Sequence, residues 1–333
     1  MKKKIGLLIL PLLLLVISQL VFIPLYFNKN LGEKINRNLV FDMNTNVFNN
    51  YLNHKFNINT DSTKILNKLK NKKNVDILVV NHFSSIDFII VFYLLNCVMR
   101  KDWILIQKKS LLYVPVINNM LSSERYISLN RDWEKDKGII EKAFSKFESG
   151  IVIIFPEGTR FSPDNYAKSK KFCQENNLIC NKKLLIPKVK GLFTIVNILK
   201  KNNRLGNIYD LSIVVPEIMN NFTKTKYSYD KLFTTNLSES YHYIRELTLP
   251  DYYYDYDTFK NWLYHQWNTK DLFLQNYKNY KYKRLIGKAS SKNVTTGYVL
   301  IVVYAYLLKN YPIHTGSSFA LSYLTSTLLA LIC

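Results

Sequence analysis

The sequence contains few cysteines, glycines and prolines for its length: four, ten and nine, respectively, among 333 residues. Cys97, Cys173, Cys180 and Cys333 are not spaced as metal-binding pairs, and no histidine lies near them at a ligand spacing, so we expect no metal site. Cys173 and Cys180 lie close enough in sequence for a disulfide in an oxidising compartment, but we expect free thiols. A disulfide-stapled scaffold and a fibrous glycine repeat are both excluded.

Acidic residues are scarce relative to basic ones. Lysine and arginine number 46 against 24 aspartates and glutamates, which gives a formal net charge of +22. Such an excess favours an anionic partner, namely nucleic acid, an acidic membrane surface or a phosphorylated substrate. Hydrophobic residues make up 48% of the chain, far more than a disordered basic tail contains. The chain is long enough to bury a sizeable core.

Charged residues are absent from long segments at both ends. Residues 5–27 are uncharged and follow three lysines, and a helix of this length spans a bilayer core. Because no small-residue cleavage site follows, we favour a retained anchor over a signal peptide, with a half-inserted helix kinked at Pro11 and Pro24 as the alternative. Residues 293–333 are uncharged apart from Lys309 and any charge on His314, which predicts a membrane hairpin or one crossing plus an interfacial helix.

The segment before this second apolar region mixes tyrosines with lysines over residues 277–284. This mixture is typical of a lipid headgroup layer, although a nucleic-acid-binding stripe has the same composition. The apolar neighbours favour the membrane. We therefore expect an N-terminal anchor at 1–30, a basic helical linker at 31–74, a globular domain at 75–277, and a basic-aromatic segment with a membrane hairpin at 278–333.

The central region alternates between strand-like and helix-like patterns. Residues 75–80 and 151–155 are short, mostly apolar segments typical of buried strands, and 211–215 is a further candidate. Helices are predicted over 85–98 and 135–148, where apolar residues share one face. This alternation predicts an α/β fold with a mainly parallel sheet flanked by helices.

A histidine and an aspartate follow the first predicted strand. Ser84 and Asp87 have the spacing of a helix capping box, which is one interpretation of Asp87. In the other interpretation His82 lies at the carboxyl end of its strand, where open α/β sheets place their sites, and Asp87 orients its imidazole. A carboxylate on one ring nitrogen strengthens the other nitrogen as a base.

Three more segments carry candidate binding groups. Residues 155–160 end a strand with Glu157, Gly158, Thr159 and Arg160, where the glycine permits close backbone approach and the arginine offers a fork to a phosphate. A surface ion pair between Glu157 and Arg160 is the alternative. Residues 126–131 are strand-like and end at Arg131, and residues 184–191 contain Pro187 and Lys188.

Together the four segments resemble, in order and spacing, the conserved blocks of the lysophospholipid and glycerolipid acyltransferase superfamily. Residues 81–87 are similar to its His-x4-Asp block, 126–131 to its arginine-ended block, 155–160 to its Pro-Glu-Gly-Thr-Arg block and 186–187 to its proline-centred block. The resemblance covers residues 75–191. It implies that His82 and Asp87 are catalytic, and it implies a substrate-binding set made of Glu157, Gly158, Thr159, Arg160, Arg131 and Lys188.

Further features are similar to the subgroup of 1-acylglycerol-3-phosphate and lysocardiolipin acyltransferases. These are residues 211–216, the Arg131-x-Trp133-x2-Asp136 pattern, and Trp262 with Trp267, for which we expect core packing. Two positions depart from the superfamily: Ser128 replaces a bulky aromatic residue and Lys188 replaces an arginine. Because lysine lacks the planar fork of arginine, the resemblance says less about the acceptor headgroup than about the reaction.

The resemblance implies transfer of a fatty acyl group from acyl-CoA, as co-substrate, to the free hydroxyl of a lysophospholipid. It implies no resident cofactor and no metal. We expect an integral membrane protein of the endoplasmic reticulum that works on a membrane with anionic lipids, and no nucleic-acid partner. One alternative is a CoA-independent transacylase that passes acyl chains between phospholipids. A more distant alternative is a membrane-tethered basic binding module without catalysis.

Overall fold

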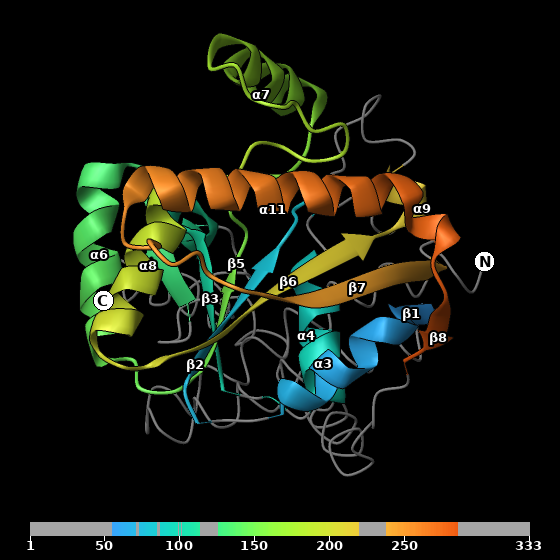
Figure 1. The fold of residues 1–333 in the computed structure, drawn as a ribbon, viewed down its shortest axis with the longest axis horizontal. Helices are drawn as coiled ribbons and strands as arrows, with labels where there is room; N and C mark the ends of the chain where they lie inside the picture. Colours follow the sequence, from blue (N-terminus) through green and yellow to red (C-terminus); the bar gives the residue numbers. More distant parts are fainter. Residues whose placement is uncertain are drawn as a thin grey trace, which may run out of the picture.

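A computed structural model of the chain describes residues 55–70, 73–84, 87–98, 100, 102–113, 126–219 and 238–285. Its central feature is an eight-stranded sheet in the order β4-β3-β5-β2-β6-β7-β1-β8 (Figure 1). The strands are β1 (Lys55–Asn59), β2 (Val75–Val80), β3 (Trp103–Lys108), β4 (Tyr126–Leu129), β5 (Gly150–Ile154), β6 (Leu205–Val214), β7 (Glu239–Leu247) and β8 (Tyr282–Arg284). All neighbours pair in parallel except β6 with β7 and β1 with β8, so the predicted mainly parallel sheet is confirmed.

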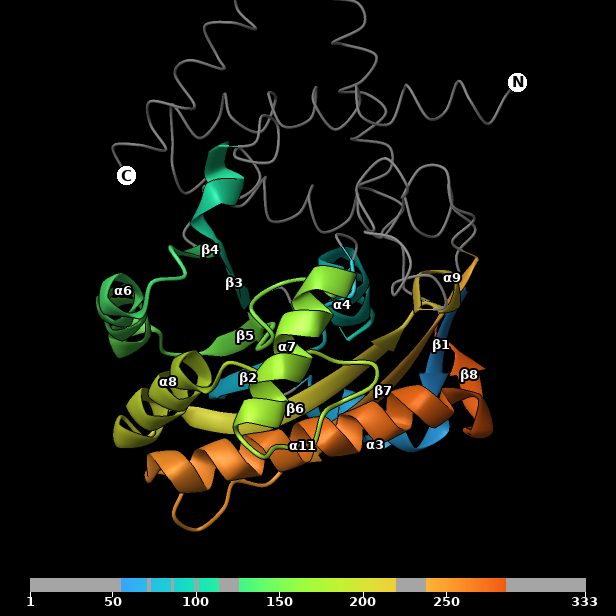
Figure 2. The ribbon, with the colours of Figure 1, turned by 90° about the horizontal axis from the view of Figure 1, so that it is seen from above.

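Helices lie on both faces of the sheet. The α-helices are α3 (Thr63–Lys68), α4 (Asp87–Cys97), α6 (Trp133–Lys146), α7 (Pro163–Glu175), α8 (Val189–Lys201), α9 (Pro216–Met219) and α11 (Tyr256–Asn276), with 3-10 turns at η2 (Thr60–Ser62), η3 (Lys109–Tyr113) and η4 (Tyr277–Asn279). In Figure 2, α6, α8 and α11 cover one face and α4 lies on the other. Helix α7 stands beyond the edge of the sheet toward which β2 and β5 point.

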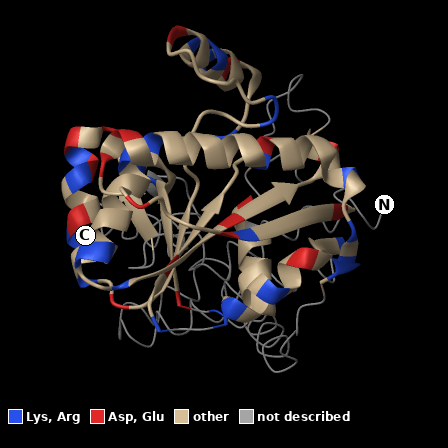
Figure 3. Ribbon diagram, viewed as in Figure 1, with Lys and Arg blue, Asp and Glu red and all other residues tan. Residues whose placement is uncertain are grey.

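The burial of the central strands explains why short apolar segments of the sequence predicted them. Every residue of β2 and β5 is buried, as expected for parallel strands covered on both faces. These two strands carry one charged residue, Asp76, which accepts hydrogen bonds from Arg100 and from the backbone of Asn207. In Figure 3 the outer helices α6 and α7 carry charges of both signs.

The sheet extends past both expected ends of the 75–277 domain. Strand β1 lies in the segment expected as a helical linker, and β8 lies in the segment expected at the lipid headgroups. Phe56 and Ile58 alternate into the core at 1% and 0% exposure, which is the period of a half-buried strand. The rings of Tyr277 and Tyr282 pack against Tyr241, so these aromatics fill the end of the core.

Membrane anchoring stays a prediction. The N-terminal anchor and the C-terminal hairpin expected from the sequence lie outside the described residues. Within the described ranges, no helix combines the length and the apolar character needed to cross a bilayer.

Candidate active site

The predicted site residues meet at one edge of the sheet. Strands β2, β3, β4 and β5 are parallel, so the segments that follow them emerge on the same side. His82 follows β2, Arg131 follows β4, and Glu157 to Arg160 follow β5. This is the carboxyl-end edge at which open α/β sheets hold their ligands.

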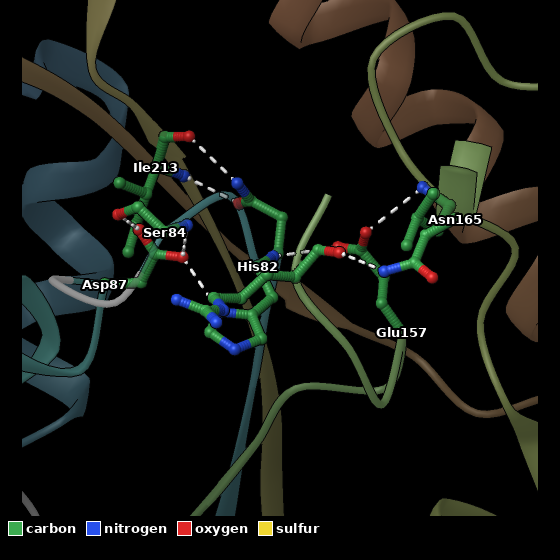
Figure 4. A network of polar contacts seen from close by, with 9 residues as sticks. His82, Ser84, Asp87, Glu157, Asn165 and Ile213 are labelled. Carbon is green, nitrogen blue, oxygen red and sulfur yellow. Dashed lines mark hydrogen bonds and ion pairs between the residues drawn. The ribbon is translucent and has the colours of Figure 1, made fainter. Parts of the chain in front are cut away.

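His82 and Asp87 are in direct contact. The imidazole Nδ1 lies 2.9 Å from Asp87 Oδ2, while the side chains are 23% and 1% exposed. The same carboxylate accepts hydrogen bonds from the backbone N–H of Ser84 at 2.8 Å and from its hydroxyl at 2.9 Å (Figure 4). Asp87 therefore bonds back to Ser84, as a capping-box residue does, and it also contacts the imidazole. A carboxylate at Nδ1 fixes the ring proton there and leaves Nε2 to act as a base.

The backbone around His82 is fixed from three directions. Its N–H donates to Glu157 Oε1 at 2.9 Å, and its carbonyl accepts from the N–H of Phe161 at 2.8 Å. The side chain of Asn81 exchanges two hydrogen bonds with the backbone of Ile213 on β6. The imidazole also packs against the Phe155 ring, 4.6 Å between centroids. A base held this rigidly needs little reorganisation during a reaction.

Glu157 is buried next to the backbone of His82. It is 2% exposed, and its second oxygen accepts the N–H of Leu185 at 3.1 Å, so the carboxylate joins the His82 segment to the segment that leads to Lys188. Burial raises the pKa of this carboxyl to about 8, against the opposing effect of the two backbone hydrogen bonds. Figure 4 shows Asp87 and Glu157 on opposite sides of His82. Both oxygens accept backbone N–H groups, which gives Glu157 a positioning role in this structure, and its expected contact with a substrate phosphate stays a prediction.

Three cations gather at the same edge. Partial burial lowers the pKa of the Arg131 guanidinium, and nearby Arg160 lowers it further. Partial burial and nearby Arg131 likewise lower the pKa of the Lys188 ammonium. We call Arg131, Arg160 and Lys188 the cation cluster. Mutual repulsion among three cations is relieved by a bound dianion such as a phosphate monoester.

Gly158 makes room for this cluster. Its φ is +67°, and a Cβ there would lie 3.0 Å from Lys188 Cδ. The aliphatic part of the Lys188 side chain therefore packs directly against the backbone of Gly158, where a larger residue would leave less room. Thr159 and the carbonyl of Arg160 both accept hydrogen bonds from the Asn165 amide in the first turn of α7.

Two residues that support the Lys188 segment were missed by the sequence analysis. Asp271 on α11 accepts the backbone N–H groups of Lys182 and Lys183 at 2.9 and 2.6 Å. Ser169 on α7 accepts the N–H of Ile186 at 2.8 Å. Neither residue has a local signal, because each acts on a segment distant in sequence.

Helix α11 is itself fixed to the sheet by a buried ion pair. Lys270 Nζ lies 2.7 Å from Asp210 Oδ1 on β6, and both side chains are at most 1% exposed. Trp267 is 1% exposed, and the indole N–H of Trp262 donates to the carbonyl of Thr248. The prediction that the two tryptophans serve packing is therefore confirmed.

The chain is similar in sequence to known acyltransferases. Residues 62–215 match the family model described as Acyltransferase. A Saccharomyces cerevisiae protein described as an uncharacterized acyltransferase is 29% identical over 238 residues, which cover 62% of this chain and 60% of that protein. Lysocardiolipin acyltransferase 1 of Mus musculus is 28% identical over 148 residues, covering 42% of this chain and 39% of that protein.

A plant relative matches over a longer stretch. The 1-acyl-sn-glycerol-3-phosphate acyltransferase 3 of Arabidopsis thaliana is 26% identical over 271 residues, covering 78% of this chain and 69% of that protein. The crystal structure of the 1-acyl-sn-glycerophosphate acyltransferase PlsC from Thermotoga maritima superposes with a TM-score of 0.48 and 16% identity, over 82% of this chain and 98% of that one.

The chain thus spans 60% of the yeast relative and 39% of the mouse relative. The resemblance read from the four blocks is confirmed by the family match, which includes all of them. Residues 62–215 of this chain thus carry an acyltransferase family-model domain.

Proposed function

We propose that this protein moves a fatty acyl group from acyl-CoA to the free hydroxyl of an anionic lysophospholipid. The observation that supports this most directly is the 2.9 Å contact between His82 Nδ1 and Asp87 Oδ2 at the same sheet edge as the cation cluster. One half of this arrangement suits proton abstraction, and the other half suits the phosphate of the acceptor.

The reaction follows from these groups. Nε2 of His82 takes the proton of the acceptor hydroxyl as its oxygen attacks the thioester carbonyl carbon, and Asp87 stabilises the imidazolium that forms. The tetrahedral intermediate collapses, the carbon–sulfur bond breaks, and the CoA thiolate takes the proton from the imidazolium. An ester and free CoA result. The hydroxyl of the acceptor takes the place of a serine nucleophile, so no acyl-enzyme forms and no resident cofactor takes part.

We further propose that the enzyme works at a membrane surface, because both substrates partition into bilayers. The uncharged residues 5–27 and 293–333 would supply the anchors, and the net charge of +22 would attract anionic lipids. Location in the endoplasmic reticulum is implied by the family resemblance alone.

The proposal is tested with membranes that contain the full chain. Labelled oleoyl-CoA is supplied with lysophosphatidic acid, lysophosphatidylinositol or lysocardiolipin in parallel, and the diacyl product is measured. His82→Ala should lower the rate by about 10²- to 10⁴-fold, the usual contribution of a general base. His265→Ala is the matched control, because His265 is exposed on α11, away from the site.

Three results separate the alternatives. Product that depends on His82 and on acyl-CoA supports the proposal and identifies the acceptor. Product formed from a labelled diacyl phospholipid without acyl-CoA would indicate the transacylase instead. Absence of product with every donor and acceptor, from folded protein, would refute both.

A further inference from the structure

We propose that Asp136 is a positioning residue, which sets the backbone of residues 130–132 and thereby holds Arg131 in the cation cluster. This inference rests on the proposed function, because it assigns to Asp136 an indirect part in binding the acceptor phosphate. Asp136 lies in the first turn of α6, which follows β4 after residues 130–132.

The Asp136 carboxylate makes four hydrogen bonds, all to the three residues before α6. Oδ1 accepts from the backbone N–H of Asn130 at 2.7 Å and from its side-chain amide at 3.1 Å. Oδ2 accepts from the backbone N–H groups of Arg131 at 2.7 Å and Asp132 at 3.1 Å. The residue is 4% exposed. Such a carboxylate stabilises a loop much more strongly than a neutral acceptor does.

Capping of α6 does not account for this network. Asp132 is the N-cap residue, and its own side chain accepts the N–H of Glu134 at 3.2 Å. Asp136 instead reaches back past the cap to the chain that leaves β4. Its hydrogen bonds therefore shape the loop that carries Arg131, in addition to any effect on the helix.

That loop has an unusual backbone conformation. Arg131 has a φ of 67°, in the left-handed region that residues other than glycine rarely adopt. The hydrogen bonds of Asp136 to Asn130, Arg131 and Asp132 hold this conformation from both sides. Since φ of a residue sets the direction of its Cα–Cβ bond, this conformation decides where the guanidinium goes.

The guanidinium goes to the cation cluster. Arg160 and Lys188, which come from two other segments, are its electrostatic neighbours. An arginine placed against two other cations needs a backbone that is held firmly, because repulsion pushes it away whenever no anion is bound. Asp136 supplies that constraint without touching the substrate.

A double-mutant cycle on the full-length protein in membranes tests the inference. The acceptor KM and kcat are measured for wild type, Asp136→Asn, Arg131→Ala and the double variant. Asparagine keeps one acceptor oxygen and turns an N–H donor toward the other N–H groups, so Asp136→Asn should raise the acceptor KM by about 10-fold with kcat nearly unchanged. If Asp136 acts through Arg131, adding Asp136→Asn to Arg131→Ala should raise KM no further.

The controls keep the result interpretable. Glu134→Gln removes an exposed charge from the same turn of α6 and should leave KM unchanged. Asn130→Ala removes one of the four hydrogen bonds, should raise KM less, and replaces Asp136→Asn in the cycle if that variant does not fold in thermal melts.

The inference is overturned if Asp136→Asn has the wild-type KM, or if the two substitutions raise KM multiplicatively. Both results require an active wild type and so differ from failure of the proposed function, in which no variant forms product.

Discussion

Replacing Asp87 by asparagine isolates the electrostatic part of its contribution to catalysis. The amide oxygen can take the place of Oδ2 and accept from His82 Nδ1 and the Ser84 N–H, which are 2.9 and 2.8 Å from it. The amide nitrogen can take the place of Oδ1 and donate to the Ser84 hydroxyl, which rotates to accept. The capping geometry and the imidazole tautomer both survive, and only the negative charge is lost.

The size of the effect follows from the geometry. A carboxylate and an imidazolium whose charge centres are about 4 Å apart, at an effective dielectric constant of about 20, attract each other by about 4 kcal/mol. This attraction exists only when the imidazole is charged, so it lowers the barrier and hardly affects binding. We therefore expect Asp87→Asn to lower kcat by about 10²- to 10³-fold and to leave the acceptor KM nearly unchanged.

The assay measures kcat and acceptor KM at saturating acyl-CoA, with His82→Ala as the activity floor. Asp164→Asn is the matched control, because Asp164 is an exposed carboxylate in the first turn of α7. A kcat within about threefold of wild type would refute the reasoning and leave Asp87 as a cap alone. A fall of kcat by much more than about 10³-fold would show that the tautomer is lost, which contradicts the hydrogen bonds assigned to the amide and to Ser84.

Three further predictions concern the support of the site. Gly158→Ala places a side chain at a φ of +67° and 3.0 Å from Lys188 Cδ, so it should lower the free energy of unfolding by about 1–2 kcal/mol and raise the acceptor KM. The control Gly138→Ala, in open space on α6, should raise the melting temperature. A change of melting temperature in the same direction for both variants would contradict this prediction. Glu157 has a folded-state pKa raised from 4.5 to about 8, so the native state binds more protons than the unfolded chain between these values, and its contribution to stability falls as pH rises through this window, by at most about 1.4 kcal/mol per pH unit. Thermal unfolding of Glu157→Gln should therefore depend less steeply on pH than that of wild type, and parallel profiles would argue against this ionisation. Asp271→Ala leaves two backbone N–H groups without their acceptor, so we expect the free energy of unfolding to fall by about 2–3 kcal/mol and the acceptor KM to rise. A lower stability with an unchanged KM would mean that the Lys188 segment holds its position without Asp271.

The sequence predicted the centre of the fold better than its edges. Strands β2 and β5 are buried on both faces, so a mostly apolar run marks each of them, with Asp76 as the one charged residue. Strand β3 alternates between buried and partly exposed residues, so it is not buried on both faces as β2 and β5 are, and its signal is weaker. Strands β1 and β8 were missed because they pair with β7 and with each other, which no local pattern reveals.

Among the residues at the site, those in recognisable sequence blocks were predicted and those that act through distant contacts were missed. His82, Asp87 and Arg160 were identified because each stands in a block with a recognisable order of residue types. Asp271 was missed because the N–H groups that it accepts from are 88 and 89 residues away along the chain. Glu157 was recognised as part of its block, but its hydrogen bonds to the backbone of His82 and Leu185 were not foreseen, since sequence alone cannot tell a buried carboxylate from one that faces a ligand.

The dependence of the Lys188 segment on Asp271 also has a consequence for biosynthesis. A ribosome adds about 5–20 residues per second. The 89 residues between Lys182 and Asp271 therefore take roughly 5–20 s to synthesise after the segment itself. During that time a nascent chain already has its histidine and all three cations but has no α11 to fix the last cation. The Lys188 segment gains these two hydrogen bonds only when this late helix docks, so a chain that ends before α11 carries all four blocks without that support.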